Sequence, residues 1–309
     1  MTGSLAGRGP TTARPTPSQW LAGARPRTLA AACSPVIAGT GVAVFEQGAS
    51  WLAALLALLV SLALQVGVNY ANDYSDGIRG TDAVRVGPLR LVGSGLASPA
   101  LVKRAAFVSF GVAGVAGLAL VIMTQHWWLV AVGIACVLAA WYYTGGTRPY
   151  GYAGLGEVSV FIFFGLVAVC GTAYVQVGRV SLATLLTGIW VGALACAILV
   201  ANNLRDIRGD AHVGKRTFAT RLGDAHTRTF YVILISLSAL LIILVAALTT
   251  WWALLGLAGL VLIIPAVRIV LSGGTGPALI AVLKATSLAE LVCAIGFAVG
   301  LILSVLRFA

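Results

Sequence analysis

Long apolar stretches alternate along the chain with short polar segments rich in Gly, Pro, Asp and Arg. A helix needs about 20 apolar residues to cross the roughly 30 Å of hydrocarbon in a bilayer, and each stretch is close to that length. The pattern predicts nine membrane-spanning helices, although shifts at the boundaries leave eight or ten open. Their approximate ranges are 26–45, 51–71, 102–124, 127–144, 157–177, 181–203, 228–249, 251–271 and 278–305.

The composition supports an all-α polytopic membrane protein, because 60% of the residues are hydrophobic and only 9% are charged. Residues 1–19 hold Pro, Thr and Arg without an apolar core, so we expect a disordered cytoplasmic tail rather than a signal peptide. Residues 20–309 are expected to form one membrane domain, with capping loops at about 72–101 and 203–228. The cysteines lie in predicted helices without metal-like spacing, which indicates packing.

The basic residues predict the orientation of the chain. Nearly all 20 Lys and Arg residues lie on one side of the predicted membrane, and only Arg179 and Arg307 fall on the other. Because cytoplasmic loops carry an excess of Lys and Arg, the N-terminus is expected in the cytoplasm and the C-terminus outside. Basic loops beside anionic lipid then explain the formal net charge of +11, and no nucleic-acid partner is expected. Five tryptophans fall at the predicted outer interface, as in an aromatic belt: Trp51, Trp127, Trp128, Trp251 and Trp252.

The acidic residues carry the main functional signal. Five of the nine Asp and Glu residues lie in two short segments, 72–82 and 202–210, which follow predicted helices of the same orientation. A carboxylate at the centre of a membrane helix costs roughly 2.5–3.5 kcal/mol, so acids are expected to be scarce and functional. These acids lie at helix ends, where the cost is smaller, and any one of them alone is compatible with a solvated loop. The five are Asp73, Asp76, Asp82, Asp206 and Asp210.

The spacing within the two segments weakens the loop interpretation. Polar residues recur at intervals of four, which places them on one face if each helix continues through its segment. Both segments also contain an Ile-Arg-Gly run, which suggests an internal duplication of a helix and its loop. Asp73 lies on the adjoining side of its helix. The residues at four-residue spacing are Asn72 with Asp76, and Asn202 with Asp206 and Asp210.

Carboxylate and amide oxygens without His or Cys form a hard-ligand set suited to Mg²⁺. This ion is usually bound through one or two carboxylates together with substrate phosphates, so the two segments could hold a diphosphate through bridging ions. Nearby basic residues could take the remaining negative charge, although each is equally compatible with a lipid contact. These basic residues are Arg79, Arg148, Arg208 and Lys215.

Both acidic segments resemble motifs of a known family. Residues 72–82, NDYSDGIRGTD, are similar to the first aspartate motif of the UbiA superfamily of intramembrane prenyltransferases. Residues 202–210, NNLRDIRGD, resemble its second motif, which continues through GKRT and RLG at 214–223. The resemblance covers residues 20 to 306.

Two further stretches resemble the branch of the superfamily that prenylates 1,4-dihydroxy-2-naphthoate. One is YTGGTRPYGY at 143–152 with GLGE at 154–157, and the other is Gly87-Pro88 with Arg90. Ser94-Gly95 departs from that branch, where a Gln-Gly pair is expected.

The resemblance implies transfer of a polyprenyl group from polyprenyl diphosphate to 1,4-dihydroxy-2-naphthoate, with loss of CO₂ and diphosphate, giving demethylmenaquinol for menaquinone synthesis. It also implies two Mg²⁺ ions that bridge the diphosphate. Nine helices would surround a central cavity, short amphipathic helices would cap its cytoplasmic mouth, and a lateral opening to membrane lipid would take the isoprenoid tail. The protein would lie in a bacterial plasma membrane with its active site facing the cytoplasm.

The family's site residues carry over to matching positions of this chain. The catalytic residues implied are Asp73, Asp76, Asp206, Asp210 and Lys215. The metal ligands implied are Asp73, Asp76, Asp82, Asp206 and Asp210. The substrate-binding residues predicted are Asn72, Arg79, Asp82, Tyr143, Arg148, Asn202, Asn203 and Arg208.

Residues outside the motifs receive weaker assignments. The reaction passes through an allylic cation, which an aromatic side chain could shield. Glu157 opens a predicted helix, where a carboxylate suits the positive helix end. Lys284 and Glu290 are predicted inside the membrane without an assigned partner. The candidates for the aromatic shield are Tyr70, Tyr74, Tyr142 and Tyr143.

Three other functions remain open. The run Asp73-x-x-Asp76-Gly77 also resembles the start of the CDP-alcohol phosphotransferase motif, but its continuation is missing. A cation transporter could use intramembrane acids and an inverted repeat, yet its acids should lie near mid-membrane. An enzyme of the same superfamily could also use another acceptor, such as 4-hydroxybenzoate, haem or homogentisate.

Overall fold

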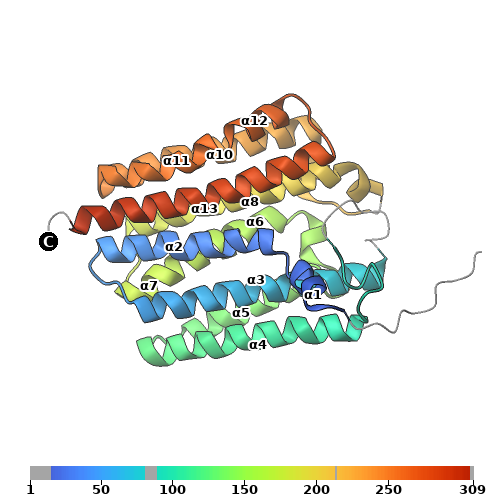
Figure 1. The fold of residues 1–309 in the computed structure, drawn as a ribbon, viewed down its shortest axis with the longest axis horizontal. Coiled ribbons are helices and arrows are strands. Elements are labelled where there is room, and N and C mark those ends of the chain that lie inside the picture. Colours follow the sequence, from blue (N-terminus) through green and yellow to red (C-terminus); the bar gives the residue numbers. More distant parts are fainter. Residues whose placement is uncertain (1–14, 81–88, 213, 307–309) are drawn as a thin grey trace, which may run out of the picture.

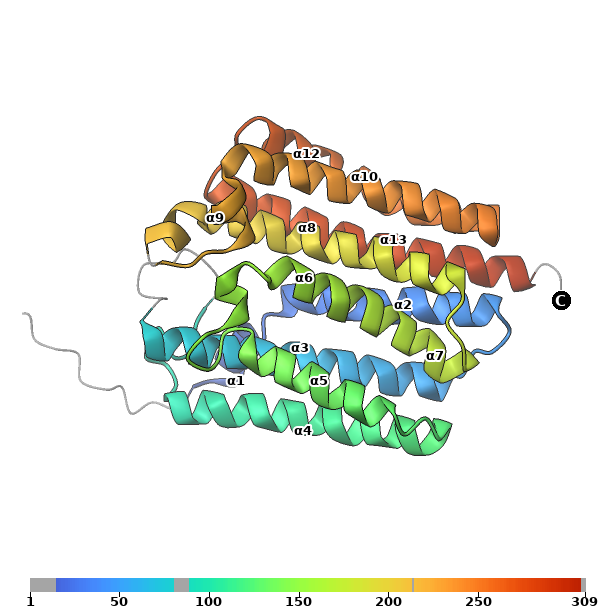
Figure 2. The same ribbon diagram turned by 180° about the vertical axis from the view of Figure 1, so that it is seen from behind.

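The computed structural model describes residues 15–80, 89–212 and 214–306, and every regular element in these ranges is helical (Figure 1). Long helices lie side by side along one axis, as the opposite view in Figure 2 confirms. The elements are α1 Pro17–Gly23, η1 Pro26–Thr28, α2 Leu29–Phe45, α3 Trp51–Arg79, α4 Pro99–Thr124, α5 Leu129–Tyr142, η2 Tyr150–Ala153, α6 Gly156–Val160, η3 Phe161–Cys170, α7 Gly171–Val177, α8 Leu182–His212, α9 Phe218–Leu222, α10 Asp224–Leu248, η4 Trp251–Leu257, α11 Ala258–Val261, α12 Ile264–Leu271 and α13 Pro277–Leu306.

Seven helical segments of the described chain are long and apolar enough to cross a membrane. The pair Trp251–Val261 and Ile264–Leu271 passes the same test together, but it is bent by 49°. The remaining predicted span is α5, a helix of 14 residues, which is shorter than a straight crossing requires. A multi-helix membrane protein is therefore confirmed, whereas nine spans, their orientation and a central cavity stay predictions.

Polar caps explain where several helices begin. Ser50 caps α3 by accepting a hydrogen bond from the N–H of Ala53, and Ser98 caps α4 in the same way. Thr16 and Gln19 form a capping box at the start of α1. Helical structure therefore begins within the segment predicted as a tail, and residues 1–14 of that tail lie outside the described residues.

The bundle consists of two groups of helices joined by α2. On one side α3 packs against α4 and α5, and on the other α8 packs against α10 and α13. Helix α2 contacts both α3 and α13, while η3 packs along α8 (Figures 1 and 2). Of the most apolar stretch of α8, 72% is buried, which is the largest share among the candidate spans of the described chain. The helix that carries the second motif is therefore the central one.

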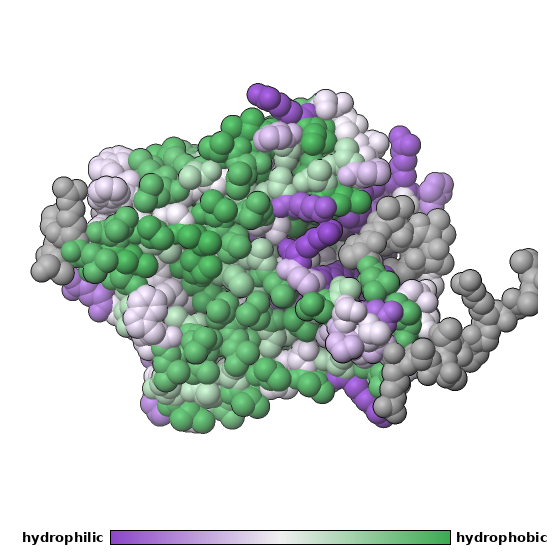
Figure 3. Space-filling view, in the orientation of Figure 1, coloured by the Kyte–Doolittle hydropathy of each residue, from purple (hydrophilic) through white to green (hydrophobic). Residues whose placement is uncertain are grey.

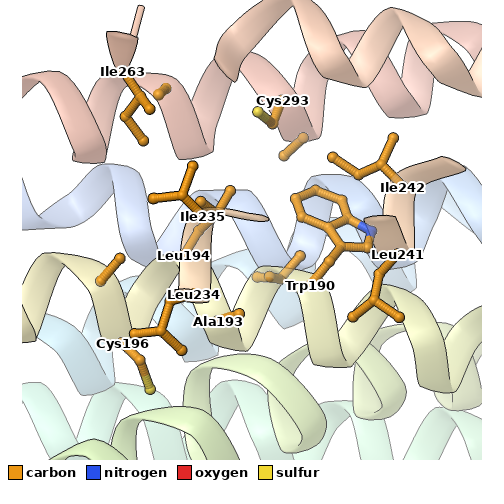
Figure 4. Close-up of a cluster of buried hydrophobic side chains, with 14 of the residues drawn as sticks. Trp190, Ala193, Leu194, Cys196, Leu234, Ile235, Leu241, Ile242, Ile263 and Cys293 are labelled. Carbon is orange, nitrogen blue, oxygen red and sulfur yellow. The ribbon is translucent and has the colours of Figure 1, made fainter. Parts of the chain in front are cut away.

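The main core lies between α8, α10 and α13 (Figure 4). Trp190 of α8 is fully buried and packs edge-on against Phe297 of α13, with ring centroids 5.5 Å apart. Ile242 of α10 and Cys293 of α13 belong to the same cluster. Large apolar side chains on facing helices thus hold α8 in place along its length.

Apolar side chains cover much of the face shown in Figure 3, while hydrophilic residues gather toward one end of it. Such a surface suits lipid rather than water. The tryptophans predicted to form a belt are all exposed, with Trp51 at 68% and Trp251 at 65%. Their exposure fits the interface anchors expected from the sequence.

Both acidic segments continue their helices. Helix α3 runs without a break to Arg79, and α8 runs to His212. Residues 72–79 and 203–212 are therefore helical, although we assigned them to capping loops from the sequence. Because both helices continue, polar residues four apart in each segment lie on one face of their helix.

Candidate active site

The two acidic segments lie at the same end of the bundle, because α3 and α8 run in the same direction (Figures 1 and 2). The connection between α5 and α6, residues 143–155, contacts the first acidic segment and the stretch that follows the second. Its backbone and side chains bond to α3 on one side and to residues 215–221 on the other. The site is thus built from two helix ends and one loop between them.

Tyr152 in η2 links the two motifs. Its hydroxyl donates a hydrogen bond to Oδ1 of Asp76. The Nζ of Lys215 lies 4.3 Å from the centroid of the Tyr152 ring and 3.8 Å from Oδ1 of Asp210. A chain of contacts therefore runs from the acid of α3 through a phenol and an ammonium group to the acid of α8. Our sequence analysis missed Tyr152, although it closes the YTGGTRPYGY stretch.

The rest of the first motif holds the same loop. Oδ1 of Asn72 accepts a hydrogen bond of 2.7 Å from the hydroxyl of Thr144. The guanidinium of Arg79 donates to the carbonyls of Thr144 and Gly146 and lies 5.5 Å from the Tyr152 ring centroid. Asn72 and Arg79 therefore bond to the same loop as Asp76, and their hydrogen bonds organise that loop.

The two aspartates of the first motif point to different partners. Asp73 accepts backbone hydrogen bonds from Leu91 at 2.7 Å and from Val92 at 3.1 Å, and it is 1% exposed. Asp76 instead faces Tyr152 and lies 3.3 Å from Nη2 of Arg90. The helix separates residues three apart by about 60° around its axis, which explains the divergence. Asp73 thus lies on the adjoining side of α3 from Asp76, as the spacing of three residues predicts, and Asp82 lies outside the described residues.

In the second motif an arginine spans one helical turn. Arg205 donates two hydrogen bonds of 2.7 Å to the carboxylate of Asp206 and a third, of 2.9 Å, to Oδ1 of Asn202. The side chains of Arg205 and Asp206 are only 6% and 12% exposed. Asn202 and Asp206 therefore share a face, as their spacing predicts, and a buried guanidinium holds both.

Asn203 points the other way, into the protein. Its side-chain amide donates a hydrogen bond of 2.9 Å to Oε1 of Glu157, and both residues are buried. Glu157 is therefore more than an acid at a helix start, because it anchors the base of the second motif to α6. The sequence analysis predicted Asn203 as a substrate-binding residue and did not pair it with Glu157.

Comparison with known proteins agrees with this arrangement. Residues 32–278 match the model of the UbiA prenyltransferase family. The chain belongs to the UbiA prenyltransferase family. It is 53% identical to 1,4-dihydroxy-2-naphthoate octaprenyltransferase of Mycobacterium leprae, over 93% of this chain and 97% of that protein. It is 36% identical to the protein of the same name from Escherichia coli, over 92% and 95%.

A solved UbiA homolog from Archaeoglobus fulgidus, bound to GPP and Mg²⁺, has the same fold. It superposes with a TM-score of 0.62 over 90% of this chain and 99% of that one, at 14% identity. The family fold is therefore confirmed over most of the chain.

Three residues predicted to bind substrate differ in their surroundings: Arg148, Arg208 and Tyr143. Arg148 and Arg208 are exposed and make no side-chain hydrogen bond or salt bridge within the part of the chain that the structure describes. Tyr143 packs edge-on against Tyr150, with ring centroids 5.5 Å apart. Burial raises the pKa of the Tyr150 phenol, which donates to the carbonyl of Ala139 at 2.7 Å. These rings stabilise the loop beside the site.

The other aromatic candidates have packing partners. The hydroxyl of Tyr70 donates to the carbonyl of Trp20 at 2.9 Å, and Tyr74 stacks on Trp141 with centroids 6.0 Å apart. Tyr142 is half exposed. Tyr152 is accordingly the ring that lies among the acids and bases of the two motifs.

The oxygen ligands fit a hard ion that shares its shell with a substrate. Within the described ranges no group of three or more His, Cys, Asp and Glu side chains could hold a metal ion. Asn72, Asp76, Asn202, Asp206 and Asp210 supply only oxygens, spread over two helix ends. Mg²⁺ commonly takes one or two carboxylates and completes its shell with phosphate oxygens and water, so a diphosphate would supply what the protein lacks.

Proposed function

We propose that this UbiA-family enzyme transfers a polyprenyl group from polyprenyl diphosphate to 1,4-dihydroxy-2-naphthoate. The contact chain from Asp76 through Tyr152 and Lys215 to Asp210 carries the donor side of the proposal, because it joins acids and bases of both motifs at one place. The acceptor rests on the 53% identical relative that bears this substrate in its name.

The donor's diphosphate would bind between the ends of α3 and α8. Asp76 and Asp206, with Asn72, Asn202 and Asp210, would hold two Mg²⁺ ions, and those ions would act as Lewis acids on the diphosphate oxygens. Lys215 and Arg79 lie around Tyr152 and would contribute charge-assisted hydrogen bonds to the same oxygens. Their positive charge stabilises the diphosphate as it leaves.

In the proposed transfer, each bond that forms is matched by a bond that breaks. The allylic carbon–oxygen bond breaks, and the diphosphate leaves with the electron pair. The ring carbon that bears the carboxylate forms the new carbon–carbon bond, and loss of CO₂ returns electrons to the ring and restores its aromaticity. The products are demethylmenaquinol, CO₂ and diphosphate. Apolar surroundings favour this order, since they keep water away from the allylic cation.

We also propose that the site faces the cytoplasm of a bacterial cell. Among the described residues, most Lys and Arg belong to helix ends and loops at the motif end of the bundle, whereas Arg179 lies at the other end, 3.2 Å from Glu46. The bias of basic residues toward the cytoplasm supports this orientation.

The test is an acceptor screen with purified enzyme in detergent, Mg²⁺ and one labelled polyprenyl diphosphate. Dihydroxynaphthoate should give a prenylated naphthoquinol with equal amounts of diphosphate and CO₂, and chelation by EDTA should stop turnover. Product with 4-hydroxybenzoate or homogentisate alone would replace the acceptor. No product with any acceptor would remove the enzyme proposal.

Two variants test the metal and diphosphate assignment. Asp76→Ala and Asp206→Ala should each lower kcat/KM by at least about 100-fold, since each removes an interaction made with the leaving group. Asp224→Ala is the matched control, because Asp224 pairs with Arg228 at 2.6 Å and is exposed. Near-normal turnover in both motif variants would contradict the assignment.

A further inference from the structure

We infer that Asp73 is a positioning residue: its carboxylate anchors the turn at residues 89–97, so that Arg90 lies beside Asp76 and acts on the donor's diphosphate. The inference rests on the proposed function for the identity of that anion. It removes Asp73 from the metal ligands that the sequence predicted, and it adds Arg90 to the donor-binding residues.

Both carboxylate oxygens of Asp73 have backbone partners. Oδ2 accepts from the N–H of Leu91 at 2.7 Å, and Oδ1 accepts from the N–H of Val92 at 3.1 Å. Two consecutive backbone N–H groups thus donate to one carboxylate, and Asp73 is 1% exposed. The carboxylate of Asp73 is thereby directed toward the turn at residues 89–97, whereas the carboxylate of Asp76 faces Tyr152 of the loop between α5 and α6.

The turn that Asp73 holds is compact. The carbonyl of Leu91 accepts from the N–H of Ala97 at 2.9 Å, and that of Val92 accepts from the N–H of Gly95 at 2.9 Å. Gly95 has a φ of 71°, a conformation that side chains rarely adopt. The turn therefore closes on itself and can be placed as one unit.

Two glycines let the turn dock closely. A Cβ added at Gly77 of α3 would collide with the side chain of Val92. A Cβ at Gly23 of α1 would lie 2.8 Å from Cδ1 of Leu91, which is fully buried. The hydrogen bonds of Asp73 thus set the register of a turn that packs against both helices.

Docking places Arg90 at the first motif. Its Nη2 lies 3.3 Å from Oδ2 of Asp76, and the two side chains are 11% and 4% exposed. A guanidinium in this position can bind diphosphate oxygens that approach Asp76, because its planar fork matches their geometry. Asp73 therefore affects the donor through Arg90 rather than by direct contact.

The internal duplication supports the same division of labour. Asn203 occupies the position in the second motif that Asp73 occupies in the first, directly after an Asn and three residues before an Asp. Asn203 also points into the protein, where its amide donates to Glu157 at 2.9 Å. In both repeats this position anchors a neighbouring segment, and in the second it needs no negative charge.

The experiment compares Asp73→Asn with Asp76→Asn in the full-length enzyme. An Asn keeps one acceptor oxygen, so amide hydrogen exchange at Leu91 and Val92 should become at least about tenfold faster in Asp73→Asn. Mn²⁺ affinity, measured by electron paramagnetic resonance with inorganic diphosphate present, should change by less than about threefold. Asp76→Asn should reverse the pattern, with weakened Mn²⁺ binding and unchanged exchange at the two amides.

Kinetics separate positioning from a general structural defect. Asp73→Asn should raise KM for the polyprenyl diphosphate by about tenfold, with kcat within about threefold of the wild type. Arg90→Ala should raise the same KM while exchange at Leu91 and Val92 stays slow. The double variant should be no worse than Arg90→Ala alone, because both changes act through one guanidinium.

Two results would overturn the inference. One is an Asp73→Asn enzyme that loses Mn²⁺ as fully as Asp76→Asn while its turn exchanges normally. The other is a normal donor KM in Arg90→Ala, which remains measurable if Asp73→Asn does not fold. Exchange and Mn²⁺ binding need no acceptor, so failure of the proposed reaction leaves the anchoring role separately testable.

Discussion

Tyr152 is the residue on which both halves of the site converge. Its hydroxyl donates a hydrogen bond to Asp76. Its ring centroid lies 4.3 Å from Nζ of Lys215 and 5.5 Å from Cζ of Arg79. A phenol is suited to this place because it combines a hydrogen-bond donor with a face that attracts cations. The two functions can be separated by mutation.

Tyr152→Phe keeps the ring and removes the donor. A hydrogen bond to a charged group is worth about 1.5–3 kcal/mol, so kcat/KM should fall roughly 10- to 100-fold. Tyr152→Leu should lower kcat/KM further, since it also removes the contacts of the ring with Lys215 and Arg79. Tyr150→Phe serves as the control, because its hydroxyl bonds to Ala139 and Ser159 away from the acids. Wild-type kinetics in Tyr152→Phe would show that the link between the motifs has no catalytic role.

What could be predicted at this scale follows from helical geometry. The shared faces of Asn72 with Asp76 and of Asn202 with Asp206 need only a period of 3.6 residues. Tyr152 could not be found in this way, because its position depends on loop bonds such as that from the N–H of Arg216 to its carbonyl. The partners of Asp73 likewise depend on how a distant turn folds back.

At the scale of elements, α8 approaches η3 through glycine. A Cβ added at Gly165 would lie 2.6 Å from the carbonyl oxygen of Gly188 and 2.6 Å from Cα of Gly192. Small residues let membrane helices approach closely and gain dispersion contacts that lipid does not replace. This contact helps to hold α8, and with it the second motif.

Gly165→Ala should therefore destabilise the protein by about 1–3 kcal/mol, since the added methyl group forces η3 away from α8. A lower midpoint of thermal unfolding in detergent would report this loss. Gly171→Ala is the matched control, because nothing lies within 4 Å of a Cβ there and Ala favours the helix. Equal midpoints for the two variants would mean that the close contact contributes little.

At the scale of the whole molecule, an apolar flank separates two different ends (Figure 3). One end carries the motifs and most basic residues, and the other carries exposed tryptophans such as Trp51 and Trp251. Hydropathy alone predicted where the helices lie, because each apolar stretch became helical. The number of membrane spans does not follow from hydropathy in the same way, since α5 is short and the segment from Trp251 is bent by 49°.

Cysteine labelling tests which end faces the cytoplasm. Thr147→Cys marks the motif end, and Val180→Cys marks the other end, where the side chain of Val180 is 48% exposed. If basic residues set the orientation, a membrane-impermeant maleimide added to intact cells should label Val180→Cys at once and Thr147→Cys only after permeabilisation. The unaltered protein controls for its native cysteines, which are half-buried or buried. The reverse order would place the motif end outside the cell and contradict the proposed orientation.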